Sequence, residues 1–184
     1  MSDKDENHLE ERCIESVRVF DGHLMKVNQD RVRLPNGAES IREYNVHPGA
    51  VMVIPVLDDG RYVMERQFRY PLRKVFLEFP AGKLDPGEEP LQTAHRELLE
   101  ETGYVAQRLE YLTTIHPVIS YSTEYIQLFA AYGLSLQEQC LDDNEFLDVV
   151  LVEPQELMGL IRQGEVTDVK TIIGAFWLCG PRAT

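Results

Sequence analysis

A run of apolar residues in the middle of the chain, from Ala50 to Leu57, has no charged position in it. Such a continuous run predicts a strand that is buried on both faces. The residues Asp58-Asp59-Gly60 predict a turn directly after it. Partner strands are expected over residues 62–68 and 76–79, and further strands over 109–115, 125–131 and 149–152.

Three later segments have helical character. Pro90 suits the first turn of a helix and Gly103 suits the residue just past its end, so residues 90–102 predict a helix with Leu91, Ala94 and Leu98 as its core stripe. Two closing helices are expected over residues 154–162 and 168–178. The segment 80–89, rich in glycine and proline, is expected to be irregular. Strands mixed with helices predict an α/β or α+β sandwich.

The beginning of the chain has a different pattern. Residues 2–12 are nearly all polar and predict a frayed tail, whereas apolar positions alternate from Cys13 to Val46. Pro35-Asn36-Gly37 is a turn signal between two strands, so we expect a small antiparallel sheet. Such a sheet is too small to be stable by itself. We therefore expect a tail and sheet over residues 1–46 and a larger domain over 47–184.

Charge and composition narrow the classes of function. The 184 residues carry 31 carboxylates against 18 Lys and Arg, a net charge of −13, which argues against binding to nucleic acid. A phosphorylated small molecule remains possible where arginines or divalent metals gather. Cys13, Cys140 and Cys179 are far apart, which predicts free thiols in a reducing compartment. With a charged start and no apolar stretch long enough to span a bilayer, the protein is expected to be soluble and cytoplasmic, without a membrane partner.

The helix predicted over residues 90–102 carries the candidate chemistry. Glu97, Glu100 and Glu101 lie at positions i, i+3 and i+4, so they share one side of the helix and repel one another. A hard cation such as Mg²⁺, which takes several oxygen ligands, removes that repulsion. The sharp turns of the preceding loop could aim the carbonyl of Ala81 at the same place. The alternative is an ordinary solvated helix face.

Across this loop and helix the chain has Gly82, Glu88, Arg96-Glu97, Glu100-Glu101 and Gly103. Their identity and spacing resemble the Nudix box of the Nudix hydrolases. Tyr104 departs from the aliphatic residue that is usual at its place. The resemblance implies an α/β fold, a Nudix-type α/β/α sandwich with a small N-terminal antiparallel β-sheet. It also implies hydrolysis of a nucleoside diphosphate derivative with Mg²⁺, or Mn²⁺ as a substitute. By this resemblance Glu97, Glu100, Glu101 and the Ala81 carbonyl are metal ligands, and Glu88 and Arg96 form a supporting ion pair.

Longer stretches, including residues 42–51, 65–71, 77–85 and 168–173, are similar to the ADP-ribose pyrophosphatase branch of that family. The similarity implies a homodimer built through the N-terminal sheet. It also implies a set of substrate-binding residues, namely Arg42, Arg66, Arg69, Lys83, Glu124 and Phe20. A guanidinium fork suits phosphate oxygens, and an aromatic ring suits adenine. Alternatively, Arg66 is an exposed strand arginine, Phe20 packs in a core and Glu124 caps a strand end.

The acidic loop 142–145 completes the expected site. By the same resemblance Glu145 approaches the metals and is itself a ligand, and Glu145, Asp143 and Glu100 are the candidate catalytic carboxylates, although such a loop could be a solvated turn. Ser120 stands where the branch has a marker proline. The expected reaction is Mg²⁺-dependent hydrolysis of ADP-ribose to AMP and ribose 5-phosphate. The alternatives are another nucleoside diphosphate sugar, a dinucleotide such as NADH, or a non-catalytic binding module on the same fold.

Overall fold

The structure is a computed structural model that describes residues 7–141 and 143–179. The described residues form two units: one runs to His47 and includes Val118–Glu124, and the other comprises Pro48–Pro117 and the chain from Tyr125 onward. Each unit is described by itself below. Cys13, Cys140 and Cys179 are free thiols, as predicted. Within the described part of the chain, no helix is both long and apolar enough to cross a membrane.

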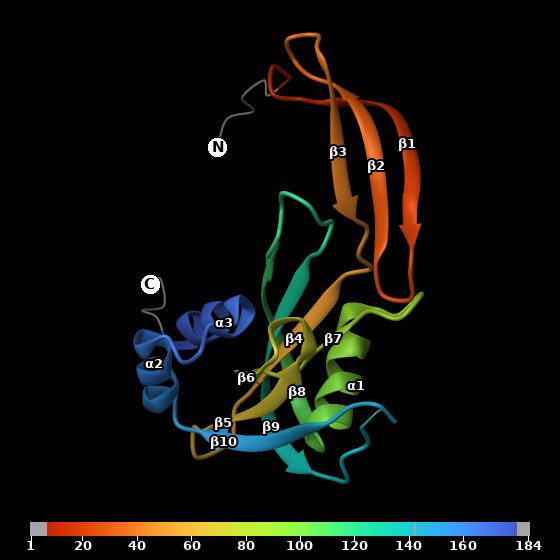
Figure 1. Cartoon of the computed structure of the whole chain (residues 1–184). Coiled ribbons are helices and arrows are strands. Elements are labelled where there is room, and N and C mark those ends of the chain that lie inside the picture. The colour runs from red at the N-terminus through yellow and green to blue at the C-terminus, as the bar shows by residue number, and fades with distance from the viewer. Residues whose placement is uncertain (1–6, 142, 180–184) are drawn as a thin grey trace. The chain divides into compact units, whose positions relative to one another are not determined.

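The first unit contains an antiparallel sheet of β1 (Arg12–Asp21), β2 (Lys26–Arg33) and β3 (Glu39–Asn45), in that order (Figure 1). The predicted turn at Pro35-Asn36-Gly37 connects β2 to β3, with Gly37 at a φ of 86°. β1 begins at Arg12, inside the predicted tail, because its pairing with β2 is set by distant residues rather than by its own composition. The segment 118–124 joins this unit through a bridge between Asn45 and Ser122.

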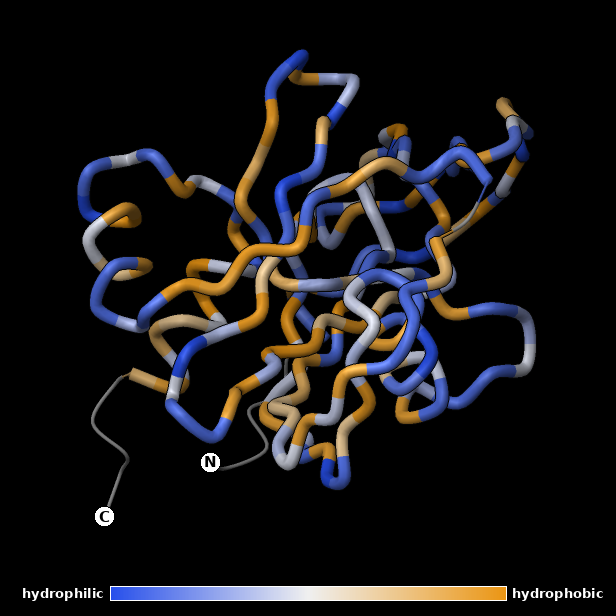
Figure 2. Tube along the Cα trace, turned by 90° about the horizontal axis from the view of Figure 1, so that it is seen from below, coloured by the Kyte–Doolittle hydropathy of each residue, from blue (hydrophilic) through white to orange (hydrophobic). Residues whose placement is uncertain are grey.

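The second unit contains two sheets. One has the order β7-β4-β9-β8, from β7 (Ala81–Lys83), β4 (Ala50–Pro55), β9 (Ile126–Leu136) and β8 (Tyr104–Ile115). The other has the order β10-β5-β6, from β10 (Leu147–Val152), β5 (Tyr62–Arg69) and β6 (Lys74–Glu78), with the short helix η1 (Tyr70–Leu72) between β5 and β6. Figure 2 shows hydrophobic and hydrophilic residues alternating along the chain, and hydrophilic residues prevailing in several of the loops.

Strand β4 explains the layers of the second unit. Met52 and Ile54 point into one core, shared with helices α2 (Pro154–Gln163) and α3 (Val169–Cys179), whereas Val51 and Val53 point into a second core with α1 (Pro90–Thr102). Figure 1 accordingly shows α1 on one side of the strands and α2 and α3 on the other. The continuous apolar run of β4 is therefore buried on both faces, and the α/β/α sandwich predicted from the sequence is confirmed.

Two local predictions were wrong. Residues 81–83 are not irregular but form β7, which pairs with β4 so that Ala81 lies opposite Met52. Leu91 does not belong to the core stripe of α1, because its side chain is 49% exposed while Ala94 and Leu98 are buried. Several other strands run longer than predicted, and β8 already begins at Tyr104. The bounds of these strands follow from their pairing with other strands.

Candidate active site

Helix α1 begins and ends at local signals that the sequence carries. Glu89 caps its start, where the backbone N–H of Glu89 donates to Oε1 of Gln92 at 3.1 Å. Pro90 occupies the first turn, and Gly103 ends the helix at a φ of 73°, which favours glycine. The predicted bounds of this helix are therefore confirmed, and the positions of its three glutamates follow from them.

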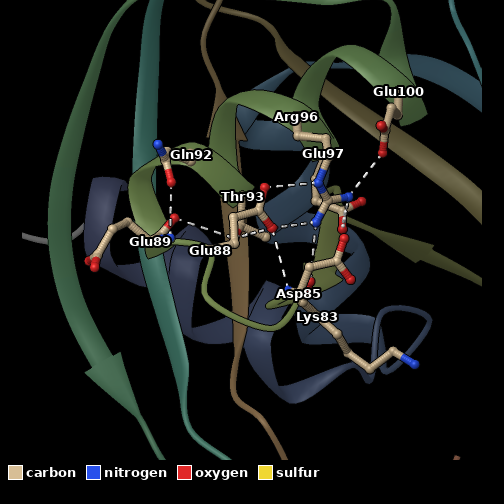
Figure 3. A network of polar contacts seen from close by, with 9 residues as sticks. All are labelled: Lys83, Asp85, Glu88, Glu89, Gln92, Thr93, Arg96, Glu97 and Glu100. Atoms are coloured by element: carbon tan, nitrogen blue, oxygen red, sulfur yellow. Dashed lines mark hydrogen bonds and ion pairs between the residues drawn. The ribbon is translucent and has the colours of Figure 1, made fainter.

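Arg96 links the loop before α1 to that helix through hydrogen bonds, as Figure 3 shows. Its Nε and Nη2 atoms donate to the two carboxylate oxygens of Glu88 at 3.1 and 2.9 Å. Its Nη2 also donates to the carbonyl of Lys83 at 3.3 Å, while the hydroxyl of Thr93 donates to Glu88 at 2.9 Å. The Arg96 guanidinium lowers the pKa of Glu88 to about 2. The ion pair between Glu88 and Arg96, predicted from the resemblance, is thus present.

Gly82 brings β7 close to α1. A Cβ atom at this position would lie 1.8 Å from Oε1 of Glu97, so only glycine leaves room for that carboxylate. Glu101 lies one turn further along and its Oε2 accepts the backbone N–H of Ala81 at 2.8 Å. The side chains of Glu97 and Glu101 therefore lie against the β7 backbone, next to the Ala81 position that the sequence suggested.

The buried carboxylates of this region repel one another. Burial and the charges of Glu65, Glu97 and Glu145 raise the pKa of Glu101 to about 10. Burial raises the pKa of Glu97 to about 7, although Arg96 opposes the shift. Glu65 on β5 is fully buried, and burial together with the charge of Glu78 raises its pKa to about 8. These side chains form what we call the acidic cluster: Glu65, Glu97, Glu101 and Glu145.

Sequence reasoning missed Glu65 as a member of the acidic cluster. Neither carboxylate oxygen of Glu65 has a hydrogen-bond partner among the described residues. The only signal in the sequence is a charged residue directly after the apolar Val63 and Met64 of a predicted strand. Its position opposite Glu78 depends on the register between β5 and β6, which the sequence does not reveal.

The acidic cluster fits a hard divalent cation by its chemistry. Carboxylate oxygens are the preferred ligands of such ions, and two buried oxygens of Glu65 lack a partner. As the side chains stand, however, no three His, Cys, Asp or Glu residues in the described part of the chain are arranged to hold a metal ion. Arg96 accounts for part of this, since its Nη1 donates to Glu97 at 2.8 Å and to Glu100 at 3.0 Å.

The acidic loop and strand β5 carry candidate residues that the sequence predicted for this region. Glu145 accepts a hydrogen bond from the side chain of Gln67 at 3.0 Å, which ties its loop to β5. Asp143 is exposed in the same loop, and Asp142 lies outside the described residues. Arg69 shares a strand face with Glu65 and Gln67, because the three alternate along β5.

Arg66 and Lys83 are less directly connected to the acidic cluster. Arg66 points to the opposite face of β5 and lines an open groove of about 590 Å³ with Leu77 and Val150. The side chain of Lys83 is exposed, and its carbonyl accepts a hydrogen bond from Arg96. The structure therefore brings Arg69, but not Arg66, to the face of β5 that carries the cluster.

Three candidate substrate-binding residues belong to the first unit. The guanidinium of Arg42 pairs with Glu11 and also donates to Oγ of Ser40 at 3.0 Å. Phe20 is exposed at the end of β1. Glu124 lies 4.0 Å from Nε2 of His47, and its backbone N–H donates to Oγ of Ser122 at 3.1 Å.

Comparisons with known proteins match nearly the whole chain. Residues 46–172 match the model described as NUDIX domain, and residues 11–45 match the model described as nucleoside diphosphate sugar hydrolase N-terminal domain. The chain is 42% identical to an ADP-ribose pyrophosphatase of Bacillus subtilis over 89% of both chains. It is 41% identical to a methanol dehydrogenase activator of Bacillus methanolicus, over 92% of this chain and 93% of the relative.

A solved structure extends the similarity to the fold. A crystal structure of an ADP compounds hydrolase superposes with a TM-score of 0.83 at 25% identity, covering 92% of this chain and 93% of that one. The likeness therefore spans both units of the described chain and includes the sheet of β1, β2 and β3.

Proposed function

The chain belongs to the NUDIX domain family, and from that membership we propose that it hydrolyses the pyrophosphate bond of ADP-ribose to give AMP and ribose 5-phosphate. The observation that carries the proposal is the acidic cluster, which lies between α1, β5 and the loop before β10. The B. subtilis relative, named as an ADP-ribose pyrophosphatase, supports the choice of substrate. The free, exposed thiols support a reducing compartment, and we propose the cytoplasm.

Members of this family generally use divalent metal ions, and we propose Mg²⁺ for this chain. Glu97, Glu100, Glu101 and Glu145, with the carbonyl of Ala81, are the residues that would hold it. A bound Mg²⁺ neutralises diphosphate oxygens and lowers the pKa of a bound water. Glu97 and Glu100 would then give up their hydrogen bonds from Arg96 and bind the ion instead. Arg96 would keep its hydrogen bond to Glu88 in the preceding loop.

The remaining roles fall to residues of this chain that meet the substrate. Arg69 on β5 is proposed to bind the diphosphate, because a guanidinium offers paired donors to phosphate oxygens. Glu145 is proposed to accept the proton of the attacking water, and its hydrogen bond from Gln67 keeps that carboxylate oriented. Arg42 is proposed to bind the diphosphate and the terminal ribose, Phe20 to stack on the adenine and Glu124 to contact the substrate.

A second candidate substrate follows from the N-terminal match. Residues 11–45 match a domain named for nucleoside diphosphate sugar hydrolases, so another nucleoside diphosphate sugar is the alternative. A dinucleotide such as NADH shares the same pyrophosphate bond. Relatives of nearly equal identity carry different names, so identity by itself does not choose among these substrates.

A substrate panel tests the proposal. The purified chain is incubated with Mg²⁺ and ADP-ribose, with other nucleoside diphosphate sugars or with NADH, in water labelled with ¹⁸O. We expect the highest kcat/KM for ADP-ribose, with AMP and ribose 5-phosphate as products and the label in one of them. The proposal fails if ADP-ribose gives no AMP while another member of the panel is cleaved.

A further inference from the structure

The turn that starts α3 makes a buried ionic contact with β6. Lys170 is 9% exposed, and its Nζ pairs with the carboxylate of Glu78 and lies 3.1 Å from Oδ2 of Asp168. Oδ2 of Asp168 also accepts the backbone N–H of Thr171 at 2.9 Å. The segment 168–173, similar in sequence to the ADP-ribose pyrophosphatase branch, thus reaches across to the strand that pairs with β5.

Glu78 is shared by two cations. Its carboxylate accepts hydrogen bonds from Nε and Nη2 of Arg69 at 2.7 and 2.8 Å. The same carboxylate also forms an ion pair with Lys170. Burial by itself would raise the pKa of Glu78, but the hydrogen bonds and charges of Arg69 and Lys170 outweigh burial and lower it. The Glu78 side chain is 3% exposed and that of Arg69 is 40% exposed, so Arg69 is the member that solvent and ligands reach.

Lys170 balances one negative charge next to the pair formed by Arg69 and Glu78. Arg69 bound to Glu78 alone is a neutral pair, which attracts an anion weakly. With Lys170 and Asp168 included, the four groups sum to zero, and without Lys170 they sum to −1. Without Lys170, a diphosphate approaching Arg69 would meet one uncompensated negative charge, shared by the carboxylates of Glu78 and Asp168.

The same turn also fixes the backbone that follows Glu78. Oγ1 of Thr171 accepts the N–H of Phe79 at 3.1 Å, and the N–H of Ala81 donates to Glu101. The chain from Glu78 to Ala81 is therefore held at one end by α3 and at the other by α1. Small movements of Glu78 are restricted by this double attachment.

We propose that Lys170 is a positioning residue for substrate binding: it holds Glu78 from the α3 side and balances one negative charge there, so that the guanidinium of Arg69 meets the diphosphate at a fixed place. This inference rests on the proposed function, in which Arg69 binds the diphosphate. Lys170 itself need not touch the substrate.

The test compares Lys170→Met with Arg162→Met, a variant that removes an exposed arginine of α2 and changes the net charge equally. With ADP-ribose and Mg²⁺, Lys170→Met is expected to raise KM about tenfold with little change in kcat, because Lys170 acts on substrate binding through Glu78 and Arg69 and not on the chemical step. Arg162→Met is expected to keep both constants. Lys170→Arg, which retains the cation, is expected to restore most of the lost affinity.

A second variant and a second measurement keep the outcomes distinct. Lys170→Gln retains an N–H donor toward Glu78 and serves if Lys170→Met does not fold, as judged by circular dichroism. Calorimetric binding of inorganic pyrophosphate with Mg²⁺ is expected to weaken in both neutral variants. Folded variants with unchanged KM and unchanged pyrophosphate affinity overturn the inference, and so does the failure of both to fold, because Lys170 would then be structural.

The proposed function is judged separately. If the wild type cleaves a different member of the panel, the proposed substrate is wrong, and the same comparison of KM is made on the substrate that it does cleave. If the wild type cleaves ADP-ribose but Lys170→Met behaves like Arg162→Met, the function stands and the inference falls. The pyrophosphate measurement does not depend on turnover.

Discussion

At the scale of single residues, Gly82 and Glu101 show how closely β7 and α1 are fitted together. Gly82 leaves space for the Glu97 carboxylate, and Glu101 accepts the N–H of Ala81. The first contact explains why the position must be glycine, and the second fixes a backbone whose carbonyl is a proposed ligand. Any substitution of Gly82 adds atoms that would clash with Glu97, whereas Glu101 can be replaced by glutamine, a side chain of similar size.

Glu101→Gln is expected to lower kcat by two or more orders of magnitude, because a metal site supplies several kcal/mol to the reaction. The amide preserves the shape of the side chain, so the far-ultraviolet circular dichroism spectrum should not change. The amide is neutral without taking up a proton, whereas burial raises the pKa of Glu101 to about 10, so the melting temperature of the metal-free protein should also rise at neutral pH. The matched control is Glu110→Gln on β8, where the glutamate is exposed.

Turnover that stayed at the wild-type level in Glu101→Gln would remove this carboxylate from the metal site. It would also revive the alternative of a binding module on the same fold, in which the acidic helix face has no catalytic role. The presence of all three helix glutamates and of the buried Glu65 argues against that alternative.

At the scale of elements, the acidic cluster joins α1 to β5 through groups that repel when charged. Glu97, Glu65 and Glu101 have a pKa of about 7, 8 and 10, against 4.5 for a free glutamate, chiefly because of burial. The folded chain therefore holds protons that the unfolded chain has lost above about pH 5. Linkage then requires the free energy of unfolding to fall as the pH rises from about 5 to 9.

A divalent cation should reverse this trend, since it binds the charged carboxylates of the folded chain. We expect the melting temperature in EDTA to fall by several degrees between pH 6 and pH 9, because about 1 kcal/mol corresponds to about 2–4 °C at this chain length. The gain on adding Mg²⁺ should grow over the same range. Differential scanning calorimetry measures the melting temperature. Sodium sulfate in place of the magnesium salt, at equal ionic strength, is the control. A gain that did not depend on pH would contradict the role of these carboxylates.

The elements that the sequence predicted correctly are those with local causes. The helix Pro90–Thr102 has its start and end signals within its own residues, and β4 has six consecutive apolar positions. β7 has three residues and depends on pairing with β4, so its sequence alone reads as a loop. Glu65 faces Glu78 only because of the register of β5 and β6. Pairing between distant segments is what a local pattern does not contain.

At the scale of the whole molecule, the sheet of the first unit supports the prediction of a homodimer. Every residue of β1 is exposed, and the strand lies at the edge of its sheet. Val17, Val19 and Phe20 are each about half exposed. A three-stranded sheet with exposed apolar side chains gains stability by burying them, and a second copy of the chain is the partner implied by the resemblance.

Light scattering at micromolar protein concentration should therefore give a mass of twice 21.1 kDa. The double variant Val17→Lys/Val19→Lys places two charges at exposed apolar positions of β1 and is expected to give a monomer, because an unpaired charge buried in an interface is strongly unfavourable. Val169→Lys, at an exposed apolar position of α3, is the control and should remain a dimer. Each chain carries a net charge of −13, so the measurement belongs at about 0.15 M salt, where repulsion between copies is screened beyond about 8 Å. A monomeric wild type under these conditions would contradict the prediction and would place the whole reaction within one chain.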